Sequence, residues 1–324
     1  MGRKPFPKGE TSQLHTVLLG WYAQHQRDLP WRKTRDPYAI LVAEVMLQQT
    51  QVERVVPKYQ EFLERFPSFE ALAEAPRAEV IRRWAPLGYN LRAVRLHEAA
   101  RQVAAQFGGR LPSGLEDLRR LKGLGPYTAA AVACFAFGQD VAVVDTNVRR
   151  VLSRILAGVA PLPEREVQAK AEAMLPKGRA SAWNQALMDL GATVCLARWP
   201  RCPVCPVRQL CKAAPLLSKG EGRVAEVRSE YLTKREPPFK GSSRYYRGRV
   251  VEALRRLADG EAMTLKALGA AIKPEACEGE FPWLLSLVRK LEADGLVKLT
   301  GDAGLDASRL RVSLPWEALA HRVR

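Results

Sequence analysis

The chain has 324 residues, enough for two or three domains with a real hydrophobic core, so a mini-protein held together by disulfides is excluded. Its composition, 47% hydrophobic and 26% charged, is ordinary for a folded protein, and no apolar run approaches the roughly 20 residues needed to span a bilayer. Lysine and arginine number 51 against 34 aspartate and glutamate residues, and the resulting net charge of +17 favours a polyanionic partner.

The N-terminal segment MGRKPFPKGE has no apolar core behind its charges, so we expect no signal peptide and a cytoplasmic, nucleoid-associated protein. An anionic membrane surface is the rival partner for a basic chain. No basic amphipathic stretch or lipidation signal supports it, and nucleic acid remains the favoured partner.

The first two thirds of the chain shows helical spacing or helical propensity in segment after segment, without the alternation typical of strands. The predicted helices cover residues 12–26, 38–50, 52–65, 69–75, 77–85, 91–107, 114–121, 127–137, 145–157, 164–175 and 181–194. This part of the chain is therefore predicted to be all-α.

A segment rich in proline, glycine, serine and charge follows, and we interpret residues 216–243 as a linker. The predicted helices beyond it cover residues 244–258, 264–272 and 281–294, and two β-prone runs follow around a Gly/Asp turn. This order predicts a small α+β, winged-helix-like C-terminal domain at 244–324. Residues 1–224 carry +13 of the charge and the rest only +4, so the basic character belongs mainly to the helical part.

Four of the six cysteines stand within 17 residues, with the spacing C-x6-C-x2-C-x5-C. They are Cys195, Cys202, Cys205 and Cys211. Four thiolates on a short loop can hold one zinc ion or one iron–sulfur cube, and zinc sites usually show two C-x2-C pairs. Because only one such pair occurs here, the spacing favours a 4Fe-4S cluster. The solitary Cys134 and Cys277 are expected to be small core residues.

The segment LKGLGPYT (121–128) places two glycines between an apolar helix and an alanine-rich one. Gly123 and Gly125 allow a tight turn and leave backbone N–H groups at the start of the second helix open to a phosphate. A simple helix connection is the alternative, because Gly-x-Gly between helices is a weak signal. The basic charge of the chain favours phosphate binding.

These motifs together resemble the helix-hairpin-helix DNA glycosylases of the endonuclease III superfamily. LKGLGPYTAAAV is similar to their hairpin, VVDTNVRRVLSR to their catalytic aspartate segment, and the four-cysteine loop to their cluster. Within that superfamily the MutY-type adenine DNA glycosylases look most similar, through LPWR (29–32), AEVMLQQTQVERV (43–55), LGYNLRAVRLHEAA (87–100) and WNQALMDLGATVC (183–195).

The resemblance implies a glycosylase core at 1–215. A six-helix barrel would cover about 30–135, and residues 1–29 with 136–215 would form the domain of the 4Fe-4S cluster. The implied enzyme is a DNA N-glycosylase that acts as a monomer on double-stranded DNA containing a mispaired adenine.

Breaking an N-glycosidic bond requires protonation of the leaving base and an anion beside the cationic sugar. Glu44 lies on the apolar helix LVAEVML, where burial should keep it protonated, and the resemblance makes it the acid. Asp145 can cap the helix that follows it, and the resemblance makes it the group that stabilises the oxocarbenium-like sugar or traps it covalently. Tyr127 stands where strand-cutting relatives carry a lysine nucleophile, so we expect a monofunctional enzyme.

The target base must leave the duplex before a side chain can reach it. The resemblance assigns Gln48 and Tyr89 to intercalation near the lesion, and Lys122 with the hairpin glycines to DNA binding. It also places Arg27, Trp31, Arg32 and Gln185 around the base pocket, with core packing as the alternative for Trp31.

Two departures from the family are visible. Thr146 stands where the family commonly has glycine, and residues 225–324 do not resemble the Nudix-like domain with which many MutY proteins recognise 8-oxoguanine. The alternatives are a thymine or uracil mismatch glycosylase of the same superfamily and a non-catalytic iron–sulfur protein that binds DNA. The tail could bind DNA itself or only pack on the core.

Overall fold

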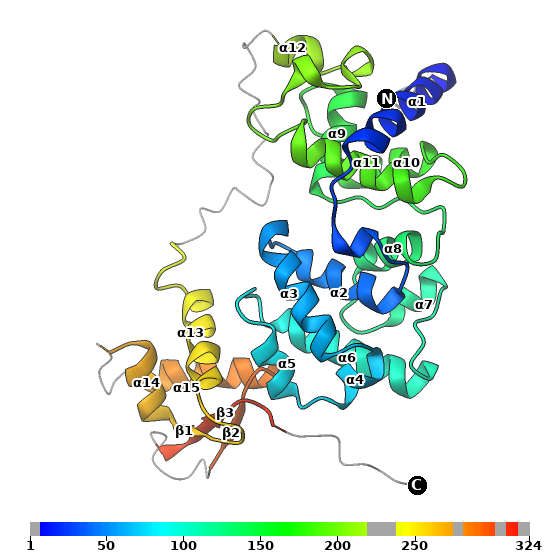
Figure 1. The fold of residues 1–324 in the computed structure, drawn as a ribbon. Helices are drawn as coiled ribbons and strands as arrows, with labels where there is room; N and C mark the ends of the chain where they lie inside the picture. The colour runs from blue at the N-terminus through cyan, green and yellow to red at the C-terminus, as the bar shows by residue number, and fades with distance from the viewer. Residues whose placement is uncertain (1–6, 219–237, 275–280, 302–308, 317–324) are drawn as a thin grey trace. The chain divides into compact units, whose positions relative to one another are not determined.

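The computed structural model describes residues 7–218, 238–274, 281–301 and 309–316. Within these ranges the chain is helical apart from three short strands near the C-terminus, which confirms the predicted fold class (Figure 1). The described residues fall into two compact units. Unit 1 lies within Met1–Ile40, Ser113–Arg119 and Gly125–Arg235, and unit 2 within Leu41–Pro112, Arg120–Leu124 and Glu236–Arg324.

Every helix predicted in the first two thirds has a counterpart in the structure. The helices are α1 (Lys8–His25), α2 (Pro37–Leu47), α3 (Val52–Arg65), α4 (Phe69–Glu74), α5 (Arg77–Arg83), α6 (Leu91–Phe107), α7 (Leu115–Arg120), α8 (Pro126–Phe135), α9 (Thr146–Ala157), α10 (Glu164–Ala173), α11 (Ala180–Thr193) and α12 (Ala214–Ser218). Short 3-10 turns occur at η1 (Pro30–Arg32), η2 (Cys202–Val204) and η3 (Arg208–Leu210).

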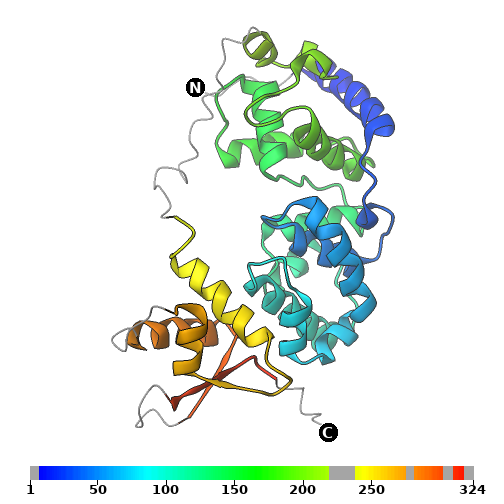
Figure 2. The same cartoon turned by 60° about the vertical axis from the view of Figure 1, so that its left-hand side comes forward.

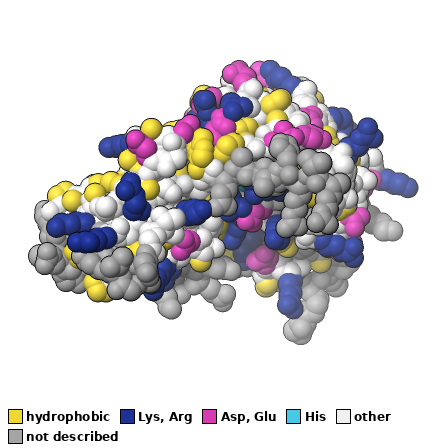
Figure 3. All heavy atoms as spheres, turned by 90° about the horizontal axis from the view of Figure 1, so that it is seen from below, with side chains coloured by type: hydrophobic (Ala, Val, Ile, Leu, Met, Phe, Trp, Pro, Cys, Tyr) yellow, Lys and Arg dark blue, Asp and Glu magenta, His cyan; other side chains and the backbone are white. Residues whose placement is uncertain are grey.

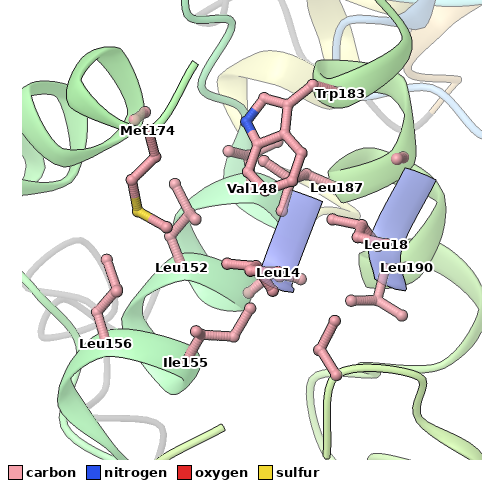
Figure 4. Close-up of a cluster of buried hydrophobic side chains, with 14 of the residues drawn as sticks. Leu14, Leu18, Val148, Leu152, Ile155, Leu156, Met174, Trp183, Leu187 and Leu190 are labelled. Carbon is pink, nitrogen blue, oxygen red and sulfur yellow. The ribbon is translucent and has the colours of Figure 1, made fainter. Parts of the chain in front are cut away.

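The core of unit 1 forms where α1, α9 and α11 meet. Figure 4 shows Leu14 and Leu18 of α1 beside Val148 of α9 and Leu187 of α11, and all four side chains are fully buried. Apolar residues recur on one face of α9 at helical spacing, and the helix buries that face. The cysteine-bearing loop packs against the same core, so its position depends on α9 and α11.

The C-terminal part of unit 2 has the element order α13 (Ser243–Arg255), β1 (Met263–Thr264), α14 (Leu265–Ile272), α15 (Phe281–Ala293), β2 (Lys298–Thr300) and β3 (Arg311–Ser313). The sheet order is β1-β3-β2, antiparallel throughout, which is the topology of a winged helix (Figure 2). The sequence did not predict β1, because two residues are too few to show strand alternation.

This winged-helix part shares one hydrophobic core with helices α5 and α6 of the same unit. Ile81 and Val94 are buried there against side chains such as Leu254. The Ala78 N–H donates to Pro315 O at 2.9 Å, and Arg255 donates to Ile81 O at 2.8 Å. Packing on the core, one of the two roles expected for the tail, is therefore observed.

Several predicted features lie outside the described residues. They include Cys277 and most of the predicted linker, of which residues 219–237 are not described. In the described ranges, no helix combines the length and apolar character needed to cross a membrane. Figure 3 shows lysine and arginine side chains spread over one face of the molecule, interleaved with acidic ones, rather than gathered in one patch.

Candidate active site

Asp145 immediately precedes α9 and caps it, which confirms the capping role that the sequence indicated. Its Oδ1 accepts a hydrogen bond from the Val148 N–H at 2.7 Å. Its Oδ2 accepts a second one from Asn147 Nδ2 at 2.9 Å. The two bonds fix the carboxylate at a helix N-terminus, where backbone dipoles stabilise a negative charge.

The contacts of Asp145 continue through Arg150 to the cysteine-bearing loop. Arg150 Nη2 donates to Asn147 Oδ1 at 2.9 Å and to Gly191 O at 2.7 Å, while Nε donates to Cys195 O at 2.8 Å. A Cβ added to Gly191 would lie 2.6 Å from the Asn147 Cβ, so α9 and α11 can approach this closely only with glycine there. One chain of hydrogen bonds thus joins the carboxylate to the first cysteine.

The four clustered cysteines lie together on that loop, and the five described cysteines form no disulfide. Burial raises the pKa of the Cys205 thiol to about 12, and the neighbouring Cys195, Cys211 and Cys202 thiols add to the rise. Among the described residues, no group of three or more His, Cys, Asp or Glu side chains is placed to hold a metal ion.

Arg154 is a buried residue of α9 that binds the cysteine-bearing loop. It donates to Leu196 O at 2.7 Å and to Ala197 O at 2.8 Å, and its Nη1 lies 3.3 Å from Cys195 Sγ. Four cysteine thiols on one short loop are a donor set of the chemical type that iron–sulfur clusters take.

Two of the predicted pocket residues, Arg27 and Arg32, converge on Asp189 of α11. Arg27 Nε lies 2.6 Å from Asp189 Oδ1, and Arg32 donates to both carboxylate oxygens at 2.7 and 2.8 Å. Asp189 is only 1% exposed. Burial alone would raise the pKa of Asp189, but the hydrogen bonds and charges of Arg32 and Arg27 outweigh it and lower the pKa. Asp189 was not singled out from the sequence, although an acid in an apolar helix is the same signal that identified Glu44.

The remaining pocket residues of unit 1 are held by packing and one short hydrogen bond. Trp31 is buried in η1. The hydroxyl of Tyr22 donates to Gln185 Oε1 at 2.6 Å, which fixes the orientation of the Gln185 amide. Tyr127 lies in the first turn of α8 and packs against a small cluster that includes Ala131 and Cys134.

The hairpin glycines have different roles. Gly123 has φ +83°, and a Cβ added there would lie 2.7 Å from the Arg95 Cβ, so both its conformation and its space require glycine. Gly125 is the N-cap of α8, with open space where a Cβ would be. Lys122 is exposed, and its N–H donates to Gln102 Oε1 at 3.0 Å. The turn is exposed at Lys122, Gly123 and Gly125, although the backbone N–H groups of Lys122 and Leu124 donate within the protein.

Glu44 lies near the end of α2 in unit 2, and the residues on either side of it in the sequence, Ala43 and Val45, are also buried. The residue is 6% exposed, and its Oε2 is shielded from solvent. Gln48 follows the end of the same helix. Tyr89 is 53% exposed and has φ +45°, a conformation that is strained for a residue with a side chain.

Comparison with known proteins identifies the family. Residues 42–177 match the HhH-GPD superfamily of base excision DNA repair proteins. The adenine DNA glycosylase of Mycolicibacterium smegmatis is 43% identical over 241 residues, covering 74% of this chain and 79% of that protein. The chain belongs to the adenine DNA glycosylase family. The human adenine DNA glycosylase is 44% identical over 217 residues, which are 63% of this chain and 40% of the human protein.

Solved structures of this superfamily share the fold. A thermostable thymine-DNA glycosylase matches with a TM-score of 0.61 and 34% identity, covering 64% of this chain and 98% of that one. An endonuclease III–DNA complex matches with a TM-score of 0.57 and 24% identity, covering 64% and 98% of the two chains. The resemblance drawn from the sequence motifs is thereby confirmed at the level of family and fold.

Proposed function

We propose that this chain hydrolyses the N-glycosidic bond of adenine mispaired with 8-oxoguanine or guanine in double-stranded DNA. The observation that carries the proposal is the identity of 42–44% with proteins named adenine DNA glycosylase, over alignments that span most of this chain. The burial of Glu44 and the capped carboxylate of Asp145 support it, because this reaction needs one acid and one anion in different surroundings. The chain acts as a monomer, in the cytoplasm and on the nucleoid.

Glu44 acts as the general acid. The carboxyl group is only 6% exposed, and in this role it transfers a proton to the bound base. Protonation of adenine makes it a better leaving group and weakens the glycosidic bond.

Asp145 stabilises the oxocarbenium-like sugar as the bond breaks. The carboxylate is held by Val148 N–H and Asn147 Nδ2 before substrate binds, so little reorganisation is needed when positive charge develops. Water then completes the hydrolysis and leaves an abasic site.

Tyr127 makes the reaction monofunctional. A phenol cannot form the imine with the sugar through which lysine-bearing relatives cut the strand. The expected product is an intact strand that breaks only after alkali. A strand break without alkali, trapped covalently by borohydride, would contradict this assignment.

The other assigned residues recognise the DNA and the flipped adenine. Gln48 and Tyr89 enter the base stack when adenine flips out, and Gln185 reads the adenine edge with its amide oriented by Tyr22. Arg27, Arg32 and Trp31 shape the pocket wall, with Asp189 holding both guanidinium groups in place. Lys122 and the hairpin glycines bind phosphate.

Cys195, Cys202, Cys205 and Cys211 hold a 4Fe-4S cluster. Their spacing on one short loop supports this assignment. When bound, the cluster would stabilise the loop that carries Arg198, Arg201 and Arg208, three exposed side chains suited to phosphates. We expect the purified protein to be brown, to absorb broadly at about 400 nm and to contain about four iron atoms per chain. A colourless protein that contains zinc would refute the assignment.

A thymine mismatch glycosylase is the second candidate, favoured by the 34% identity to a thermostable thymine-DNA glycosylase. A panel of duplexes with A:8-oxoG, A:G, T:G and U:G pairs, treated with alkali after reaction, separates the two. Cleavage at adenine is expected to exceed cleavage at thymine and uracil. The reverse preference would establish the second candidate.

A further inference from the structure

Arg92 of α6 is a buried cation whose contacts are almost all to backbone carbonyl groups of two turns. The residue is 7% exposed, and a buried charge is costly unless its donors are satisfied. Nη1 and Nη2 donate hydrogen bonds, whereas the buried Nε has no hydrogen-bond partner among the described residues. Within the described residues it makes no ion pair with a carboxylate. Its guanidinium instead lies between the turn that follows α2 and the turn that precedes α6, and those turns carry Gln48 and Tyr89.

At the first turn, Arg92 Nη1 donates to Val45 O at 3.0 Å, to Met46 O at 2.9 Å and to Gln48 O. The carbonyls at the end of a helix lack partners within the helix and carry the negative end of its dipole, so a guanidinium there caps α2. Arg92 Nη2 also donates to Thr50 Oγ1 at 2.9 Å. The turn between these two contacts includes Gln49 with φ +54°, a strained conformation for a residue with a side chain.

At the second turn, Arg92 Nη2 lies 3.3 Å from Gly88 O and 3.5 Å from Leu87 O. The guanidinium carbon also lies 5.5 Å from the centre of the Tyr89 ring and 5.3 Å from that of the Trp84 ring. These are cation–π distances. Tyr89 is therefore held at its ring and, through its neighbour Gly88, at its backbone, while half of its surface faces solvent.

We infer that Arg92 is a positioning residue that presets both Gln48 and Tyr89 for entry into the base stack. One side chain holds two strained turns that are more than 40 residues apart in sequence, so both inserting groups are ordered before DNA binds. Local strain at such positions persists only where surrounding contacts maintain it, and Arg92 supplies those contacts. The inference rests on the proposed function for the step that it assists.

The test compares adenine that must be unstacked with adenine that is already unstacked. Arg92→Met and Arg92→Lys are assayed under single-turnover conditions on an A:8-oxoG duplex and on the same strand single-stranded. Loss of positioning should lower the duplex rate by on the order of tenfold or more relative to the single-strand rate, because only the duplex requires unstacking. Lysine keeps the positive charge but lacks the planar guanidinium group with its several donors. The ratio for Arg92→Lys should therefore lie between those of Arg92→Met and wild type.

Arg101→Met is the matched control, since Arg101 is a partly buried arginine of the same helix that donates to Ala73 O at 3.3 Å. Arg101→Met should lower the stability of the fold without changing the ratio of the duplex rate to the single-strand rate. Thr50→Val loosens Arg92 without removing it and provides a variant that folds if Arg92→Met does not. Thr50→Val should lower the ratio of the duplex rate to the single-strand rate, by a smaller factor than Arg92→Met does. Equal losses on both substrates for the Arg92 variants would overturn the inference.

A second measurement does not depend on base release. 2-Aminopurine placed beside the target adenine fluoresces more strongly when it is unstacked, and saturating wild-type protein should increase its emission. Arg92→Met should give a clearly smaller increase at saturation, and an unchanged increase would overturn the inference. A wild-type protein that unstacks the probe without releasing adenine from either substrate would instead disprove the proposed function and leave Arg92 supported.

Discussion

Arg150 Nη2 donates to Asn147 Oδ1 at 2.9 Å, and Asn147 in turn donates from Nδ2 to Asp145 Oδ2 at 2.9 Å. Asn147 therefore fixes the second oxygen of the carboxylate while it is fixed itself by a guanidinium bound to the cysteine-bearing loop. The orientation of Asp145 therefore depends on the contact between Asn147 and Arg150 as well as on the hydrogen bond that caps α9.

Asn147→Leu should remove both hydrogen bonds and leave Asp145 with its helix-capping bond alone. We expect the single-turnover rate of adenine release to fall by about 10- to 100-fold, since misplacing a reacting group costs this much, while the Kd for DNA changes little. Arg149→Ala, a change two residues further along α9, is the control and should retain most of the rate. A full rate for Asn147→Leu would show that the capping bond alone orients Asp145.

Gly191→Ala should destabilise unit 1, because the new Cβ would meet Asn147 Cβ at 2.6 Å and its Cα at 3.2 Å. The expected loss is about 1–3 kcal/mol, typical of overpacking between rigid elements. Gly20→Ala in α1, where nothing lies within 4 Å of an added Cβ, is the matched control and should be neutral or stabilising. Urea unfolding measures both, and equal stabilities of the two variants would contradict the close approach of α9 and α11.

Asp189→Asn should lower the unfolding free energy at neutral pH by on the order of 3 kcal/mol, because it leaves two guanidinium groups without their buried counter-charge. The pKa of Asp189 is lowered in the folded protein, so its contribution is present above its ordinary value near 4 and is lost as the pH falls through the folded pKa. Thermal unfolding over a pH series checks both statements. A variant as stable as wild type at pH 7 would show that the ion pairs contribute little.

His97 should make the protein less stable in mild acid. Burial lowers its pKa from 6.5 to about 3, and the nearby Arg101 and Arg77 charges lower it as well. The unfolded chain thus binds a proton that the folded chain does not. The contribution of His97 to stability is therefore fully present above pH 6.5 and is lost, at about 1.4 kcal/mol per pH unit, as the pH falls toward 3.

His97→Gln keeps a donor near Ala75 O, to which His97 Nε2 donates at 3.1 Å, but does not titrate. Its unfolding free energy should fall less steeply than that of wild type between pH 6.5 and 5. Parallel curves for the two proteins would show that His97 is not the source of the acid sensitivity.

The sequence predicted the helices of the first two thirds well because each carries its own spacing and its own glycine or proline boundary. α1 nevertheless begins at Lys8, four residues before the predicted start. Glu44 and Asp145 could be found because an acid in an apolar run, or before a helix, is a local signal.

Asp189 carried the same local signal as Glu44, yet its partners Arg27 and Arg32 are about 160 positions away in the sequence. The role of Arg92 could not be predicted from the sequence, because an arginine in a helix is common and its five carbonyl acceptors are brought together only by the fold. Groups that hold the site depend on tertiary contacts, whereas groups that perform the chemistry are visible in the chain.

The identity of the released base tests the central claim most directly. Equal amounts of the A:8-oxoG, A:G, T:G and U:G duplexes are mixed with wild-type protein, and the free bases are identified by mass spectrometry. Our account predicts that adenine is the main product, and that Glu44→Gln and Asp145→Asn release almost none while still binding the duplexes. Release of thymine or uracil in preference to adenine, or full activity of Glu44→Gln, would contradict it.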